Sequence, residues 1–135
     1  MDTLDRFVRA QQGGYDQALG ELRAGRKTGH WIWFVLPQLR GLGRSSTAHE
    51  YGIAGREEAQ AYLAHPLLGA RLRECVQAML THTGRSAVSV LGDVDAMKFR
   101  SCLTLFDAVA DDDLFLNALD AFYGGERDAA TLALL

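Results

Sequence analysis

The 135-residue sequence contains only two cysteines and two prolines, and each shortage excludes a class of protein. Cys75 and Cys102 lie at apolar positions without CxxC spacing, so we expect free buried thiols rather than a disulfide or a metal site. Proline is scarce and the chain has no low-complexity tract or repeat, unlike a disordered protein. We therefore expect a single folded domain over residues 1–135.

Long apolar runs and metal-ligand spacings are also missing from the sequence. No apolar run approaches the roughly 18 residues of a membrane span, and the N-terminal MDTLDRF has no signal-peptide core. The four histidines are scattered without an HxxxH pattern. We expect a cytoplasmic protein that does not cross a membrane, with no metal and no cofactor.

Acidic residues slightly outnumber basic ones, and the net charge of −3 argues against a dedicated nucleic-acid-binding protein. The distribution is uneven, because residues 22–49 contain five basic and no acidic residues, whereas residues 91–135 contain nine acidic and three basic ones. A local positive field in an acidic protein favours capture of a small anion. Nothing in the pattern points to a particular homo-oligomer.

Apolar residues recur at helical spacing through most of the chain, which predicts an all-α domain of about seven helices with no sheet. Asp2 is placed to cap the first helix, and Gly25 to end the second in the left-handed conformation. His65 is expected to cap the long helix that follows it. Thr47 and Glu50 have the spacing of a capping box.

The apolar run WIWFVL at residues 31–36 is ambiguous in its periodicity. Its aromatic and β-branched residues favour a strand, but Pro37 ends the run and no second strand candidate exists to pair with it. We expect a short buried helix or an irregular segment.

Residues 23–44, RAGRKTGHWIWFVLPQLRGLGR, carry the clearest functional signal. The segment contains both tryptophans, four glycines and five basic residues. Trp31 and Trp33 are either core residues or a stacking platform, because an indole beside Arg or Lys is suited to bind a flat ligand such as a nucleobase. A strand would place both rings on one face, whereas a helix would direct them apart by about 200°.

Basic residues flank the apolar run on both sides, at Arg26, Lys27, Arg40 and Arg44. If the chain turns at Pro37, both basic flanks converge, and the neighbouring glycines let backbone N–H groups approach an anion. The alternative is a solvated basic surface without a specific ligand.

Candidate acid–base and polar pocket residues lie in and beyond this segment. His30 adjoins several cations, which disfavour its protonated form, so it is either a neutral base or a structural hydrogen-bonding residue. Glu58 is a second candidate for acid–base chemistry, or a surface residue at a helix start. Lys98 precedes Ser101 and Thr104, whose hydroxyls either line a polar pocket or bond back to helix carbonyls.

The strings GRKTGHWIWFVLPQLRGLG, AYLAHPLLGARL and KFRSCLTLF resemble an uncharacterised bacterial domain family of about 140 residues that often carries the label calpastatin. The resemblance covers nearly the whole chain and implies an all-helical domain without an assigned reaction. Calpastatins are disordered repeat proteins, unlike this apolar, periodic chain. A remoter likeness is to small helical domains proposed to handle ADP-ribose or NAD-derived ligands. The matching positions are Lys27, His30, Trp31, Trp33, Pro37, Gln38, Tyr51, His65, Arg71, Lys98, Ser101 and Thr104.

Two functions remain open from the sequence. The first is binding or processing of a small phosphorylated or nucleotide-like molecule, such as an ADP-ribose or NAD derivative, in a basic pocket containing Trp and His. The second is a non-catalytic protein-interaction module that uses the basic 23–44 loop. The sequence does not decide whether the protein is an enzyme. The candidate catalytic residues are His30 and Glu58, and the candidate ligand-binding residues are Arg26, Lys27, Trp31, Trp33, Gln38, Arg44, Tyr51, Lys98, Ser101 and Thr104.

Overall fold

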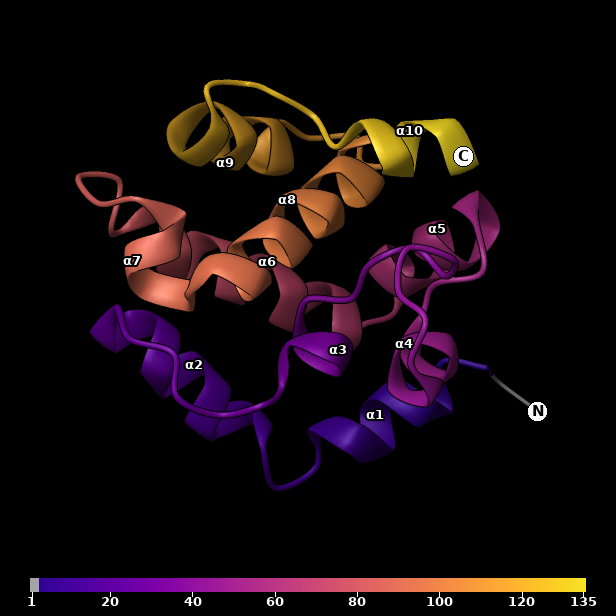
Figure 1. The fold of residues 1–135 in the computed structure, drawn as a ribbon. Coiled ribbons are helices and arrows are strands. Elements are labelled where there is room, and N and C mark those ends of the chain that lie inside the picture. The colour runs from indigo at the N-terminus through magenta and orange to yellow at the C-terminus, as the bar shows by residue number, and fades with distance from the viewer. Residues whose placement is uncertain (1–2) are drawn as a thin grey trace.

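The computed structural model describes residues 3–135 and contains ten helices in this range (Figure 1). The expectation of an all-α fold is confirmed, whereas the expected number of about seven helices is too low. Asp2, the expected cap of the first helix, lies outside the described residues. The helices are α1 (Asp5–Gln11), α2 (Tyr15–Ala24), α3 (Ile32–Val35), α4 (Ser46–Tyr51), α5 (Arg56–Ala64), α6 (Leu68–Leu80), α7 (Ala87–Leu91), α8 (Asp93–Asp107), α9 (Leu114–Tyr123) and α10 (Ala129–Leu134).

Four of the ten helices, α3, α4, α7 and α10, have only four to six residues. Such short helices are marginal on their own and depend on caps and tertiary packing. The side chains of Ser45, Ser86 and Asp128 each cap one of them by accepting a backbone N–H bond. Ser45 therefore caps α4, and the capping box expected at Thr47 is wrong.

Two other expected helix ends are confirmed by the backbone and the hydrogen bonds. Gly25 ends α2 in the left-handed conformation with φ of 74°. His65 Nδ1 accepts hydrogen bonds from the N–H groups of Leu67 and Leu68, each at 3.2 Å, at the start of α6. The imidazole therefore satisfies two backbone donors that a helix start leaves unpaired.

The core surrounds α6 and α8, which pack against most of the other helices. In Figure 1, α9 and α10 lie on one side of α8, and α1 and α2 lie on the opposite side of the molecule. The fully buried ring of Tyr62 joins three helices, because it lies 5.1 Å from the ring of Phe7 and 5.4 Å from the ring of Phe106, between centroids. None of the described helices has the length and apolar character needed to cross a bilayer.

Residues 3–135 contain no strand, and their one isolated β-bridge pairs Leu39 with Ile53 in parallel. The N–H of Ile53 donates to the carbonyl of Gln38 at 2.9 Å, and the N–H of Arg40 donates to the carbonyl of Ile53 at 2.8 Å. The bridge fastens the loop after α3 to the loop after α4.

Cys75 and Cys102 are both free and buried, as expected from the sequence. Burial raises the pKa of the Cys75 thiol to about 12 and raises that of Cys102 well above its usual value. A thiol reacts as its thiolate, so we expect neither cysteine to react with a disulfide reagent at pH 8 in the native protein. Both should react in urea, and native labelling of either thiol within minutes would contradict this expectation.

Candidate functional site

A pocket of about 270 Å³ opens between the loop that follows α3, the first half of α8 and the start of α10. Its lining combines one aromatic ring, aliphatic side chains, an amide, an ammonium group, a hydroxyl and a carboxylate. Four of the candidate ligand-binding residues from the sequence line it. The lining residues are Trp33, Gln38, Leu42, Gly43, Val94, Met97, Lys98, Ser101, Asp128 and Ala130.

The two tryptophans have different environments because the run 31–36 forms a helix rather than a strand. Trp31 is buried, with 4% of its surface exposed, and its indole N–H donates to Glu21 Oε1 at 2.9 Å. Trp33 is partly exposed and forms a wall of the pocket. Each of the two roles considered from the sequence therefore matches the position of one ring: Trp31 lies in the core, and Trp33 is accessible to a ligand.

Glu21 fixes the loop that leads into α3. Its carboxylate accepts hydrogen bonds from the N–H groups of Thr28 and Gly29, from the Trp31 indole and from the Gln17 amide. Burial alone would raise the pKa of Glu21, but the backbone donors of Gly29 and Thr28 and the two side-chain donors lower it to about 2. Glu21 thereby fixes the conformation of residues 28–31, which lead directly to Trp33.

Asp95 forms ion pairs with two lysines, each of which contacts one of the two indoles. Its carboxylate lies 2.6 Å from Lys27 Nζ and 3.6 Å from Lys98 Nζ. The Lys27 ammonium lies 4.8 Å from the centroid of the Trp31 ring, and the Lys98 ammonium lies 3.8 Å from that of Trp33. Lys27 has only 5% of its side chain exposed, so Lys98 is the member of this group that reaches the pocket.

Gln38 and Gly43 shape the opposite wall. A Cβ at Gly43 would lie 3.7 Å from Gln38 Nε2, 3.7 Å from Trp33 Cη2 and 2.7 Å from the Cβ of Ala48. The bare backbone of Gly43 therefore packs where a larger residue would clash, and it brings the Gln38 amide and the Trp33 ring together. The Gln38 amide has no hydrogen-bond partner among residues 3–135, so it is available to a ligand.

The hydroxyls on α8 mainly hold α10 in place. Ser101 Oγ lies 3.1 Å from Asp128 Oδ2, and Thr104 Oγ1 accepts the N–H of Asp128 at 2.9 Å. Each hydroxyl also lies within hydrogen-bond distance of the carbonyl four residues earlier. Ser101 lines the pocket as well, whereas Thr104 does not.

The other candidate residues lie outside the pocket. Arg26, His30 and Arg44 are exposed and do not belong to its lining. Tyr51 packs its ring against those of Phe7 and Phe34, with centroids 6.0 and 5.6 Å apart. The structure therefore brings together Trp33, Gln38, Lys98 and Ser101 in the pocket. Of the basic residues that flank the apolar run, Lys27 is linked to Lys98 through Asp95, whereas the three arginines lie elsewhere.

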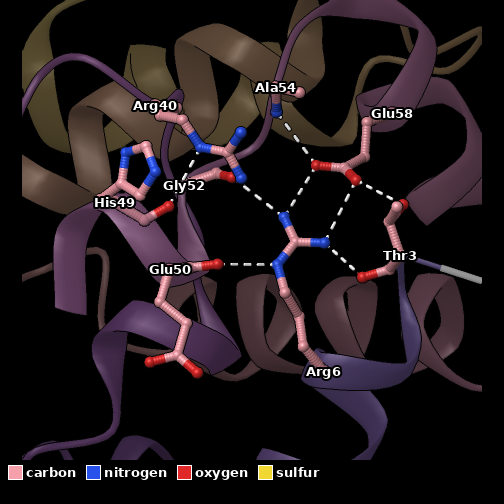
Figure 2. A network of polar contacts seen from close by, with 8 residues as sticks. All are labelled: Thr3, Arg6, Arg40, His49, Glu50, Gly52, Ala54 and Glu58. Atoms are coloured by element: carbon pink, nitrogen blue, oxygen red, sulfur yellow. Dashed lines mark hydrogen bonds and ion pairs between the residues drawn. The ribbon is translucent and has the colours of Figure 1, made fainter. Parts of the chain in front are cut away.

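Glu58 lies in a different network, at the start of α5 (Figure 2). Its carboxylate forms a two-pronged ion pair with the Arg6 guanidinium, at 2.8 and 3.1 Å, and also accepts bonds from Thr3 Oγ1 and the Ala54 N–H. Burial alone would raise the pKa of Glu58, but Arg6, Thr3 and Ala54 lower it to about 2. A carboxylate held in this way is a weak base, so the geometry favours a structural role.

Sequence reasoning missed Glu21, Asp95 and Asp128, which position the residues of the pocket. A signal existed for Asp95, because an acid three residues before Lys98 on a helix lies on the same face. Glu21 accepts hydrogen bonds from residues at most ten positions away, but the turn that brings these donors to it leaves no pattern in the sequence. Asp128 caps α10 locally, whereas its bond to Ser101 depends on the fold. No cluster of His, Cys, Asp or Glu in residues 3–135 could hold a metal ion.

Comparisons with known proteins agree with this architecture and name no activity. Residues 1–135 match the family model described as "Protein of unknown function (DUF1810)". The crystal structure of the conserved hypothetical protein Rv1873 from Mycobacterium tuberculosis is 51% identical, with a TM-score of 0.96, over 98% of this chain and 95% of that chain. The search of curated proteins found no significant match. Neither description mentions a ligand, a reaction or a calpain inhibitor.

Proposed function

Since the chain belongs to the DUF1810 family, whose description assigns no reaction, we propose a function from the pocket itself. The protein binds a small planar molecule that carries an oxygen acceptor, such as the base of a nucleotide-like ligand, against the exposed part of Trp33 and beside Lys98. The ammonium group beside the accessible indole is the single observation that supports this proposal most strongly.

The donors of the pocket outnumber its free acceptors. An ammonium group has three N–H donors. Asp95 and the Trp33 ring contact only part of the Lys98 ammonium, so it keeps N–H donors for a ligand. The Gln38 amide supplies two further donors and one acceptor. A carbonyl, carboxylate or phosphate oxygen of the ligand would pair with Lys98, while the Gln38 amide would form hydrogen bonds with the edge of its ring.

The pocket also has apolar side chains that would contact the faces of a planar ligand. Val94 and Met97 are 64% and 66% exposed at the pocket, one turn apart on α8. Leu42 and Ala130 complete this apolar part of the lining. Ligand sites commonly combine an apolar lining with a few polar groups that fix orientation.

The size of the pocket limits how much of a ligand it encloses. Its volume of about 270 Å³ lies near the lower limit of about 300 Å³ for small-molecule sites. One ring system fits better than a whole dinucleotide, so the remainder of an ADP-ribose or NAD-like molecule would extend outside. Neither His30 nor Glu58 lines the pocket, and we therefore propose binding rather than catalysis.

Tryptophan fluorescence tests this proposal, because only one of the two indoles is accessible. We expect AMP or ADP-ribose to quench the emission of the wild type and to raise its melting temperature. Trp33→Phe should abolish the quenching, since the remaining Trp31 is sealed in the core. Lys98→Gln should weaken binding by about tenfold or more, because it removes a charged donor.

Arg44→Gln is the matched control, because this exposed arginine does not line the pocket. It should bind as tightly as the wild type. Ribose, which has neither a flat ring nor a charged oxygen, should leave the emission of Trp33 unchanged. The proposal fails if no nucleobase, nucleoside or nucleotide quenches the emission of Trp33, or if Lys98→Gln binds like the wild type.

A further inference from the structure

A second hollow, of about 340 Å³, lies beside the Arg6–Glu58 ion pair and is separate from the pocket of Trp33. Three arginines from two distant segments, α1 and the loop after α3, meet there. A neighbouring hollow shares Arg6, Arg9 and Glu50 with it. The lining residues of the second hollow are Thr3, Arg6, Arg9, Arg40, Glu50, Ala54 and Glu58.

Arg6 is fully engaged and forms the wall of this hollow (Figure 2). Its Nε donates to the carbonyl of Glu50 at 2.8 Å, and its terminal nitrogens donate to the carbonyls of Thr3 and Gly52 and to both oxygens of Glu58. These bonds use all five N–H donors of a guanidinium. The charge of Arg6 is balanced by Glu58, so neither group is free for a ligand.

Arg40 is held in place but keeps free donors. Its backbone N–H bonds to Ile53 across the bridge, and its Nε donates to the carbonyl of His49 at 3.0 Å. A Cβ at Gly52 would lie 2.6 Å from the Cα of Arg40, which shows how closely the two loops pack. The two terminal nitrogens of Arg40 have no hydrogen-bond partner among residues 3–135. A planar fork fixed at Nε is suited to a two-pronged bond with an oxyanion.

The charge balance of the hollow favours a negative ligand. Once Arg6 and Glu58 cancel each other, Arg9 and Arg40 face one acid, Glu50, among the lining residues that lie within 3–135. Figure 2 shows that the Glu50 carboxylate points away from the guanidinium of Arg6, although the Glu50 carbonyl accepts its Nε–H. Within the described part of the chain, Arg9, Arg40 and Glu50 have no ion-pair partner, so these lining residues contribute one net positive charge to the hollow.

We propose that Arg40 and Arg9 form a binding site for a small oxyanion, a phosphate or a carboxylate group. Arg40 grips two oxygens through its terminal nitrogens, and Arg9 supplies the second charge from α1. The site is independent of Trp33 and Lys98, so it stands or fails separately from the proposed function.

Thermal melting with added anions at constant ionic strength tests the site. Inorganic phosphate should raise the melting temperature more than chloride does, and acetate as a separate arm distinguishes a carboxylate site from a phosphate site. Titration should show that Arg40→Gln weakens anion binding by at least tenfold. Arg9→Gln should weaken it by a smaller factor, and it serves as the second variant because Arg9 is exposed and its loss does not threaten the fold.

Arg44→Gln, four residues along the same loop, is the matched control and should retain full anion affinity. Trp33→Phe should also retain it, which separates this site from the pocket of Trp33. The proposal is overturned if phosphate and acetate stabilise the protein no more than chloride does. It is equally overturned if both arginine variants bind the anion as the wild type does, which would mean an anion held elsewhere.

Discussion

Replacing Arg6 with alanine is expected to lower the free energy of unfolding by about 3 kcal/mol and the melting temperature by about 10 °C. The Arg6 and Glu58 side chains are only 16% and 11% exposed, so the variant leaves a largely buried carboxylate without its cation. It also removes the donors that tie α1 to the carbonyls of Glu50 and Gly52. Urea and thermal unfolding followed by circular dichroism would measure the loss.

Arg9→Ala is the control for this prediction, because Arg9 lies one turn along the same helix and is exposed. It should change stability by no more than about 0.5 kcal/mol. A double-mutant cycle of Arg6→Ala with Glu58→Gln should give a coupling energy of about 1 kcal/mol or more. If Arg6→Ala unfolds at the same urea concentration as Arg9→Ala, the ion pair contributes nothing measurable to stability.

Acidification from pH 5 to pH 2 is expected to remove about 3 kcal/mol of stability through Glu58 alone. Its pKa is about 2 in the folded protein and about 4.5 as the ordinary value. A lowered pKa contributes stability that is complete above about pH 4.5 and is lost as the pH falls toward 2. Glu21 shifts in the same direction, with a pKa of about 2, and solvent screening makes its contribution smaller.

Urea midpoints measured between pH 5 and pH 2.5 would test this dependence. Glu58→Gln should be less stable at pH 5 and should show a flatter pH profile than the wild type. Glu57→Gln, its exposed neighbour, should follow the wild-type profile. A Glu58→Gln profile as steep as that of the wild type would assign the acid sensitivity to other carboxylates.

The helical class followed from the sequence because long amphipathic helices such as α6 and α8 repeat apolar residues at three and four. The number of helices did not follow, because helices of four to six residues have too few positions to show a period. Capping residues were the signal from which these short helices could be located. Ser45 shows that this signal does not fix the exact residue at which a helix begins. Serine and threonine are both good caps, and only the observed bond to the Ala48 N–H selects Ser45 over Thr47.

The pocket was partly predictable for a related reason. Trp33 stood out as an indole close to basic residues, Gln38 because it follows the apolar run, and Lys98 and Ser101 because they lie on an otherwise apolar helix. These residues do share one pocket. The basic residues near Trp33 in sequence did not join it, because a helix and two loops direct neighbours to different surfaces. Charge clustered along a chain therefore says little about charge clustered in space.

The arginine hollow shows the converse. Arg6 and Arg40 are separated by more than 30 residues. Arg40 stood out as one of the basic residues that flank the apolar run, but nothing in the sequence linked it to Arg6. They meet because the bridge carries Arg40 to the loop that α1 packs against. Only coordinates could reveal this meeting, since no local period links the two segments.

The bridge between Leu39 and Ile53 places one stretch of backbone between the two hollows. Gln38 faces one hollow and Arg40 faces the other, and both are fastened to Ile53 by backbone hydrogen bonds. A destabilising substitution at Gly52 or Ile53 would therefore disturb both the pocket of Trp33 and the hollow lined by Arg9 and Arg40. If such a variant lost both binding activities, the cause would be the backbone that the two sites share. The result would not show that one ligand occupies both sites.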